Sequence, residues 1–141
     1  LGMAIANSVA AIQAGASIVD GCARGFGAGA GNTQLEVLVA VLNRMGYETG
    51  IDLHKILTAG NIAEKFLMEK TPTISSTSIV SGLSGVFSGF LKPVNRIASK
   101  YSVDPMDILF MLGQRKIVAG QEDIIIEVAE SLAKKKEGSF E

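Results

Sequence analysis

The sequence has little cysteine, little histidine and no excess charge of either sign. Its single cysteine, Cys22, excludes an internal disulfide and fits a protein of the reducing cytoplasm. The 13 basic and 14 acidic residues nearly balance, so no basic surplus indicates nucleic-acid binding. His54 is the only histidine, and no cluster of histidine, cysteine and carboxylate residues has metal-ligand spacing. We interpret His54 itself as a plain surface or interface residue.

Long hydrophobic runs are missing as well. The most apolar stretch, residues 79–91, has about 13 residues, whereas a membrane-spanning helix needs roughly 20. Residues 1–16 are rich in alanine but lack the positive charges that begin a signal peptide. A helical pattern starts at once, without an initiator methionine. We therefore expect no membrane segment, and we expect a piece of a longer protein.

Glycine, in contrast, is concentrated at one place. Residues 25–31 read Gly-Phe-Gly-Ala-Gly-Ala-Gly, and Asn32 follows them. The apolar residues 17–23 before this run predict a buried strand, and residues 33–45 after it have helical periodicity. A strand, a glycine loop and a helix in this order place backbone N–H groups at a helix N-terminus, where anionic ligands bind. Asn32 is expected to cap that helix.

Two interpretations of this loop compete. It either lines a substrate site or turns tightly above a strand, and we favour the first. The expected substrate-loop residues are Gly27, Gly29, Gly31 and Asn32. As a dinucleotide fingerprint, Gly25-x-Gly27-x-x-Ala30 fits only the G-x-G-x-x-A variant, and no acid follows at a second strand end. Nearby, Asp20 and Arg24 either face the site or have structural and surface roles, and Cys22 is expected to be a small buried hydrophobe.

The remaining chain predicts helices. Helical spacing and end signals place them at residues 3–14, 33–45, 53–70, 76–101, 105–118 and 122–136. Asp52 and Asp104, the latter followed by Pro105, are N-cap signals. Gly60 and Asn61 are the candidate point for an interruption of the third helix. Gly82, Gly85 and Gly89 would share one face of the fourth helix, where they allow close packing.

The predicted strand has no partner in this sequence. One strand cannot form a sheet, because its edges need neighbours. We therefore interpret residues 1–70 as the last βα segment of a larger α/β body. Thr71-Pro72 marks a break, and residues 71–141 predict a small helical domain. The fold class is mainly α.

Several tracts resemble the 4-hydroxy-2-oxovalerate aldolase family. The first half contributes Leu1-Gly2-Met3-Ala4-Ile5-Ala6-Asn7-Ser8, Val19-Asp20-Gly21, residues 27–32 and residues 35–42. The second half contributes Gly85-Val86-Phe87-Ser88, Asp107-Ile108-Leu109 and Gly120-Gln121-Glu122-Asp123. The glycine–asparagine loop occurs across a wider pyruvate-aldolase and acyl-CoA lyase superfamily, whereas the tracts of the second half are more specific. The resemblance implies the C-terminal fragment of a (β/α)8 TIM barrel followed by a helical communication domain.

The resemblance also implies a reaction and a partner. The family cleaves 4-hydroxy-2-oxo acids to pyruvate and an aldehyde with a divalent metal, manganese or magnesium, and serves aromatic hydrocarbon catabolism. Its metal ligands and its catalytic histidine and arginine would precede Leu1, so we expect this chain alone to be inactive. Its communication domain binds an acylating aldehyde dehydrogenase, to which the aldehyde passes through a channel, and the resemblance implies channel lining as the alternative role of Gly82, Gly85 and Gly89. At the family's active-site tyrosine this chain has Phe87, which cannot donate a hydrogen bond or a proton.

Two further expectations concern assembly. The lone strand and the barrel-facing sides of the first two helices lack cover, so we expect a homo-oligomer. The alternative to an aldolase is a non-catalytic helical module for protein interaction, and a nucleotide-binding protein is the third interpretation.

Overall fold

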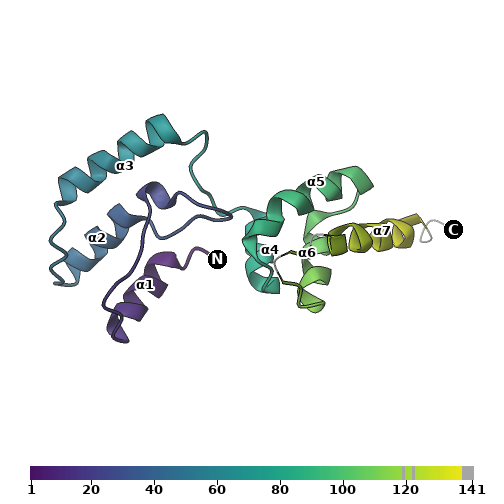
Figure 1. Cartoon of the computed structure of the whole chain (residues 1–141), viewed down its shortest axis with the longest axis horizontal. Helices are drawn as coiled ribbons and strands as arrows, with labels where there is room; N and C mark the ends of the chain where they lie inside the picture. Colours follow the sequence, from purple (N-terminus) through teal and green to yellow (C-terminus); the bar gives the residue numbers. More distant parts are fainter. Residues whose placement is uncertain (119, 122, 138–141) are drawn as a thin grey trace. The chain divides into compact units, whose positions relative to one another are not determined.

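The computed structural model describes residues 1–118, 120–121 and 123–137 (Figure 1). It divides into two compact units, one at Gly2–Thr73 and one from Ile74 onward that also includes Leu1. The described residues contain helices and turns but no strand, so the mainly α class is confirmed. None of the described helices is both long and apolar enough to cross a membrane.

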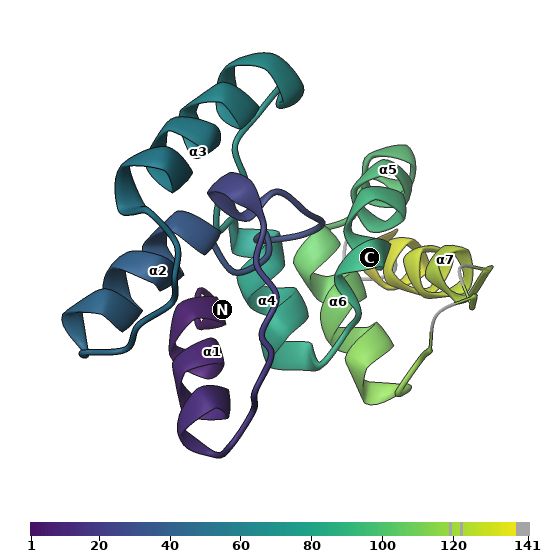
Figure 2. The ribbon, with the colours of Figure 1, turned by 60° about the vertical axis from the view of Figure 1, so that its left-hand side comes forward.

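The first unit is a layer of three helices. Its elements are α1 (Ala4–Gln13), the 3-10 turn η1 (Ala23–Gly25), α2 (Leu35–Arg44) and α3 (Leu53–Leu67). Figures 1 and 2 show α2 between α1 and α3, each of which packs on it. The side chains that this packing buries are Leu38, Val39, Leu42 and Ala63. The cap predicted for α3 is confirmed, because the Asp52 carboxylate accepts a hydrogen bond of 3.0 Å from the Lys55 N–H.

The buried strand predicted for residues 17–23 is wrong. In the described part of the chain, this region forms only an isolated parallel bridge between Cys22 and Gln34. Ile18, which the apolar pattern placed in a core, is 83% exposed. The physical reason is that a strand needs neighbours to pair its backbone groups, and the described residues supply none.

Helix α3 is continuous through Gly60 and Asn61, so the predicted interruption is wrong. A Cβ atom at Gly60 would lie 3.2 Å from Oε1 of Glu36, a buried side chain of α2. Glycine therefore leaves room for a carboxylate between two packed helices. The helix ends at Leu67, three residues before the predicted end.

The second unit is a bundle with its own core. Its elements are α4 (Ser76–Ser84), the 3-10 turn η2 (Ser88–Phe90), α5 (Leu91–Tyr101), α6 (Pro105–Gln114) and α7 (Asp123–Glu137). Helix α4 packs on α6, and α7 packs on both α5 and α6. The core includes Val94, Ile108, Leu109, Leu112, Ile125 and Val128, whose side chains are completely buried.

The single helix predicted for residues 76–101 is wrong, because Gly85 interrupts it. Gly85 has a φ of +67°, ends α4 and donates a hydrogen bond to the Ser81 carbonyl. The chain restarts through η2, and Pro93 lies in the first turn of α5, where proline fits. Gly82, Gly85 and Gly89 consequently do not share one helical face.

Helix α6 begins as predicted and ends early. The Asp104 carboxylate accepts a 2.7 Å hydrogen bond from the Met106 N–H, and Pro105 is the first helical residue. The helix ends at Gln114 rather than near Val118, since Lys116 takes a φ of +51°. The predicted start of the last helix, Glu122, lies outside the described residues.

Candidate functional site

The glycine loop needs glycine for two different reasons. Gly31 has a φ of +93°, and a Cβ atom there would lie 2.6 Å from the Gly25 carbonyl oxygen and 2.7 Å from Pro72 Cβ. At Gly27 the obstacle is only space, because a Cβ atom would lie 2.4 Å from Asn32 Nδ2. The loop is therefore folded tightly onto itself and onto the segment at Pro72.

Asn32 closes the loop instead of capping α2, so the predicted cap is wrong. Its Nδ2 donates to the Phe26 carbonyl at 3.0 Å and lies 3.4 Å from Cys22 Sγ, while its N–H donates to the Gly25 carbonyl at 2.8 Å. Gln34 precedes α2 and makes no side-chain cap bond. Asn32 thus joins the two ends of the loop. Cys22 is half-buried rather than fully buried.

A charged cluster holds the start of the loop. Glu36 is only 2% exposed, and its two carboxylate oxygens accept hydrogen bonds from the Arg24 N–H at 3.1 and 3.2 Å. The Arg24 guanidinium also contacts Glu36, with Nη1 3.4 Å from Oε1. Its Nε lies 2.9 Å from Oε2 of Glu64, and Nη2 donates to Asn61 Oδ1. Arg24 therefore ties the loop to both α2 and α3.

Sequence reasoning left the role of Arg24 open and missed Glu36. Two features of the sequence could have indicated Glu36. It is the single acid within the apolar sequence of α2, and α3 has a glycine, Gly60, where its carboxylate packs. Arg24 is 31% exposed, so water screens this ion pair in part, but removing Arg24 would leave the Glu36 carboxylate buried without its charged partner. The cluster is thus strong enough to fix where the loop begins.

A shallow depression of about 420 Å³ lies beside the loop. Its lining comes from α1 and from both flanks of the loop: Ala4, Asn7, Ser8, Ala11, Val19, Asp20, Gly31, Asn32 and Thr33. The hydroxyl oxygens of Ser8 and Thr33 lie 3.0 Å apart and form a hydrogen bond. Asn7, Asp20 and Asn32 add amide and carboxylate groups, so the depression can bind a small polar group by hydrogen bonds.

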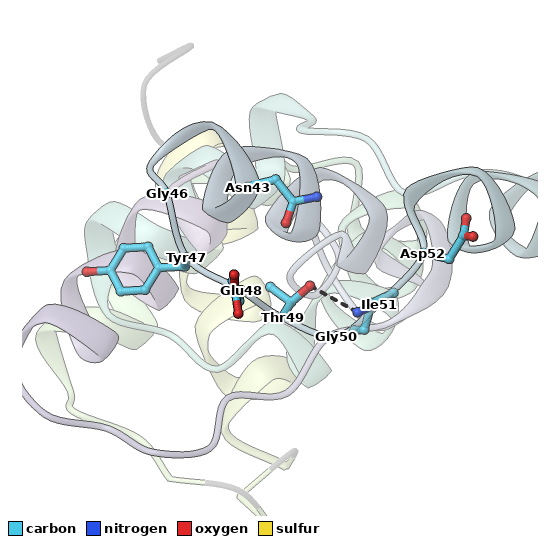
Figure 3. A pocket seen from close by; sticks show the side chains of 8 residues that line it. All are labelled: Asn43, Gly46, Tyr47, Glu48, Thr49, Gly50, Ile51 and Asp52. Atoms are coloured by element: carbon cyan, nitrogen blue, oxygen red, sulfur yellow. Dashed lines mark hydrogen bonds between the residues drawn. The ribbon is translucent and has the colours of Figure 1, made fainter.

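A second depression follows the connection from α2 to α3 (Figure 3). The residues that line it are Asn43, Gly46, Tyr47, Glu48, Thr49, Gly50, Ile51 and Asp52. All belong to one segment, in which Thr49 Oγ1 accepts a 3.2 Å hydrogen bond from the Ile51 N–H. The Asp52 carboxylate is already used as the cap of α3. This depression therefore combines no groups from distant parts of the chain.

Metal ligands do not gather in the described part of the chain. No three histidine, cysteine or carboxylate side chains within it lie close enough together to hold a cation. His54 is exposed in the first turn of α3. The donor groups described here therefore do not fit a divalent metal.

Phe87, the other expected site residue, belongs to the second unit. Its ring is 60% exposed and meets Phe90 edge to face, with ring centroids 6.4 Å apart. A phenyl ring in this setting offers apolar contact alone. The polar groups of the loop and of the depression beside it all belong to the first unit.

Two family models match successive parts of the chain. The HMGL-like model matches residues 1–63, and the model of the DmpG-like communication domain matches residues 72–134. These two matches fit the end of a TIM barrel followed by a helical domain.

Curated relatives match nearly the whole chain. A 4-hydroxy-2-oxovalerate aldolase of Pectobacterium atrosepticum is 66% identical over 100% of this chain and 41% of its own length. Those of Streptomyces tendae and Burkholderia pseudomallei strain 668 are 65% and 48% identical, over 99% and 97% of this chain and over 39% and 40% of their own lengths. The chain thus spans about two fifths of the relatives it matches.

Proposed function

Because this chain belongs to the 4-hydroxy-2-oxovalerate aldolase family, we propose that it is the C-terminal part of an enzyme that cleaves 4-hydroxy-2-oxo acids to pyruvate and an aldehyde. The order of the two family matches along the chain carries this proposal. In such a cleavage the 4-hydroxyl loses its proton and the C3–C4 bond breaks. The bonding electrons form the pyruvate enolate, which a proton at C3 converts to pyruvate.

The glycine loop contributes donors for the anionic end of the substrate. The backbone N–H groups of residues 27–30 make no hydrogen bond within the described part of the chain, whereas Gly31 and Asn32 donate inside the loop. Free N–H groups on a tightly held loop suit a carboxylate, because they need no reorganisation when it binds. Arg24 and Asn32 keep the loop in this conformation.

The whole enzyme would use a divalent metal, manganese or magnesium, to stabilise the negative charge of the enolate. Since the donors described in this chain do not fit a metal, none of its residues is assigned to that step. We place the metal ligands outside these 141 residues and expect the chain alone to be inactive. Phe87 cannot donate a proton, so any proton transfer at its position needs another group.

A chimera tests this proposal. In the Pectobacterium atrosepticum relative, residues 1–141 of this chain replace the matching segment, and pyruvate release from 4-hydroxy-2-oxopentanoate is measured with manganese through lactate dehydrogenase. We expect the chimera to turn over, and the chain alone to release nothing. A Gly27→Ala chimera should lose most activity, while Gly46→Ala, where a Cβ atom meets open space, is the matched control. A folded chimera without turnover would contradict the proposal.

The second unit would dock a partner, and we propose an acylating aldehyde dehydrogenase that accepts the aldehyde. The match to a communication domain and the separate core of this unit support that role. The same core also supports the alternative of a non-catalytic interaction module. Partner binding without turnover by the chimera would favour the module.

We also propose that the chain self-associates through the first unit. Ile18, Phe66 and Leu67 each expose more than two thirds of their surface, and such apolar surface favours association. Light scattering over a range of concentrations should show a mass above that of the monomer. A monomeric mass at the highest concentration would refute this expectation.

A further inference from the structure

Helix α5 carries a line of positive charges, of which Lys100 also lies over the Tyr101 ring, with Nζ 5.4 Å from the ring centroid. Lys92, Arg96 and Lys100 are exposed and lie four residues apart, so they form one line along the helix, called the basic face below. Val94, Ile97 and Ala98 on the opposite side are buried. The sequence of α5 contains no acidic residue, although the whole chain has a net charge of −1.

The basic face forms no ion pair within the described part of the second unit. Of the nearby acids of α7, Glu127 pairs with Arg115 at 3.0 Å, and Glu130 accepts a hydrogen bond from the hydroxyl of Tyr101, the last residue of α5, without forming an ion pair with the basic face. Like charges at i and i+4 repel by about 0.2–0.5 kcal/mol per pair, so this arrangement contributes nothing to the stability of the helix.

Positive charge also gathers at one end of α5. Lys136 Nζ of α7 donates to the carbonyl of Ser102, the residue directly after α5, at 3.3 Å. The last turn of α7 contains Lys134, Lys135 and Lys136, so its positive charge lies beside the end of the basic face. The lysines of this turn therefore add to the positive potential at this end of α5, whereas the acidic residues of α7 lie mainly in its earlier turns.

We propose that the basic face is the surface on which the second unit docks a protein partner, and that this partner presents a matching row of carboxylates. The inference rests on the proposed docking role of this unit. The three charges span about 12 Å at 1.5 Å per residue, which suits acids at i, i+4 and i+8 of a partner helix. Such charges act mainly by steering the encounter between two surfaces.

Other anionic partners fit less well. Three charges can neutralise only about three phosphates, too few for a typical nucleic-acid site of roughly six to ten phosphate contacts. Between the charges lie Asn95 and Ser99, which offer neither aromatic rings for stacking on bases nor apolar groups for insertion into lipid.

The test compares two variants of the full chain from which three positive charges have been removed. One is Lys92→Gln/Arg96→Gln/Lys100→Gln on the basic face. The control is Arg44→Gln/Lys55→Gln/Lys65→Gln, three exposed basic residues on α2 and α3 of the first unit. With immobilised acylating aldehyde dehydrogenase, we expect the first variant to lose about tenfold or more in on-rate at low salt and little in off-rate. The control should stay within about twofold of the wild type.

Poly-L-glutamate is a second probe that does not depend on the dehydrogenase. Binding should again be lost in the basic-face variant and kept in the control. If the wild type fails to bind the dehydrogenase, the proposed partner is wrong. Binding to poly-L-glutamate then tests by itself whether the basic face binds carboxylates. Equal loss in both variants would overturn the inference. So would tighter binding of the wild type to duplex DNA or to phosphatidylserine vesicles than to poly-L-glutamate.

Discussion

The two units of this chain bury their apolar side chains to very different degrees. In the second unit, several large side chains from three helices have no exposed surface, and they form one continuous core. In the first unit, burial is limited mainly to one side of α2, while Phe66 of α3 is 68% exposed. The comparison shows that similar length and helix content do not make two halves equally independent, because stability follows the apolar area removed from water.

The largest expected difference is in folding of the separated halves. A fragment of residues 74–141 should unfold cooperatively on heating, since it keeps its core. A fragment of residues 1–73 should show weak helicity, bind a hydrophobic dye and aggregate. Circular dichroism and dye fluorescence measure both outcomes, with the whole chain as the control. Cooperative unfolding of the first fragment would remove the distinction between the units.

A matched pair of leucine substitutions sharpens the comparison. Leu112 is completely buried in the second core, whereas Leu42 lines a groove of the first unit. Leu112→Ala should lower the free energy of unfolding by about 2–5 kcal/mol, because it leaves a cavity. Leu42→Ala should cost less than about 2 kcal/mol, since its surroundings open to solvent. Urea unfolding followed by NMR signals from each unit tests this order, and equal costs would contradict it.

Local signals in the sequence predicted the helix starts well. Asp52 and Asp104 cap α3 and α6 because a cap depends only on residues two or three positions away. The predicted strand failed for the opposite reason, since pairing depends on neighbours that no local pattern contains. The break at Gly85 was visible as a glycine but ambiguous, because glycine also permits close helix packing.

The candidate site was predictable in outline only. The glycine run indicated a tight loop, but the residues that hold it act over distance. Arg24 meets Glu36 twelve positions away and reaches Asn61 and Glu64 on α3, and these contacts exist only once the helices pack. Gly113 in α6 is a similar case, since its missing side chain makes room for Ser84 of α4.

A glycine substitution at the loop tests how firmly the first unit holds it. In Gly31→Ala, the positive φ should lower the free energy of unfolding by about 1–2 kcal/mol. The overlap with Gly25 and Pro72 adds about 1–3 kcal/mol. At Gly46→Ala, with a φ of +85° and open space, only the first cost applies. Thermal unfolding should rank Gly31→Ala as the more destabilised variant. Equal melting temperatures would show that the loop shifts to accommodate the added Cβ atom without loss of stability.

The smallest expected effect concerns a contact between two helices of the second unit. The hydrogen bond to Glu130, with lesser contributions from desolvation and from its charge, raises the pKa of Tyr101 above the ordinary 10.0. Since the folded state holds this proton more tightly, the stabilisation is complete below about pH 10 and is lost as the pH rises through the folded pKa.

In a Tyr47→Phe background, tyrosinate absorbance reports Tyr101 alone. Glu130→Ala should bring its pKa back toward 10.0, whereas Glu127→Ala, which removes the acid paired with Arg115, should leave it raised. Identical titrations in all three proteins would show that the contact between α5 and α7 does not form in solution.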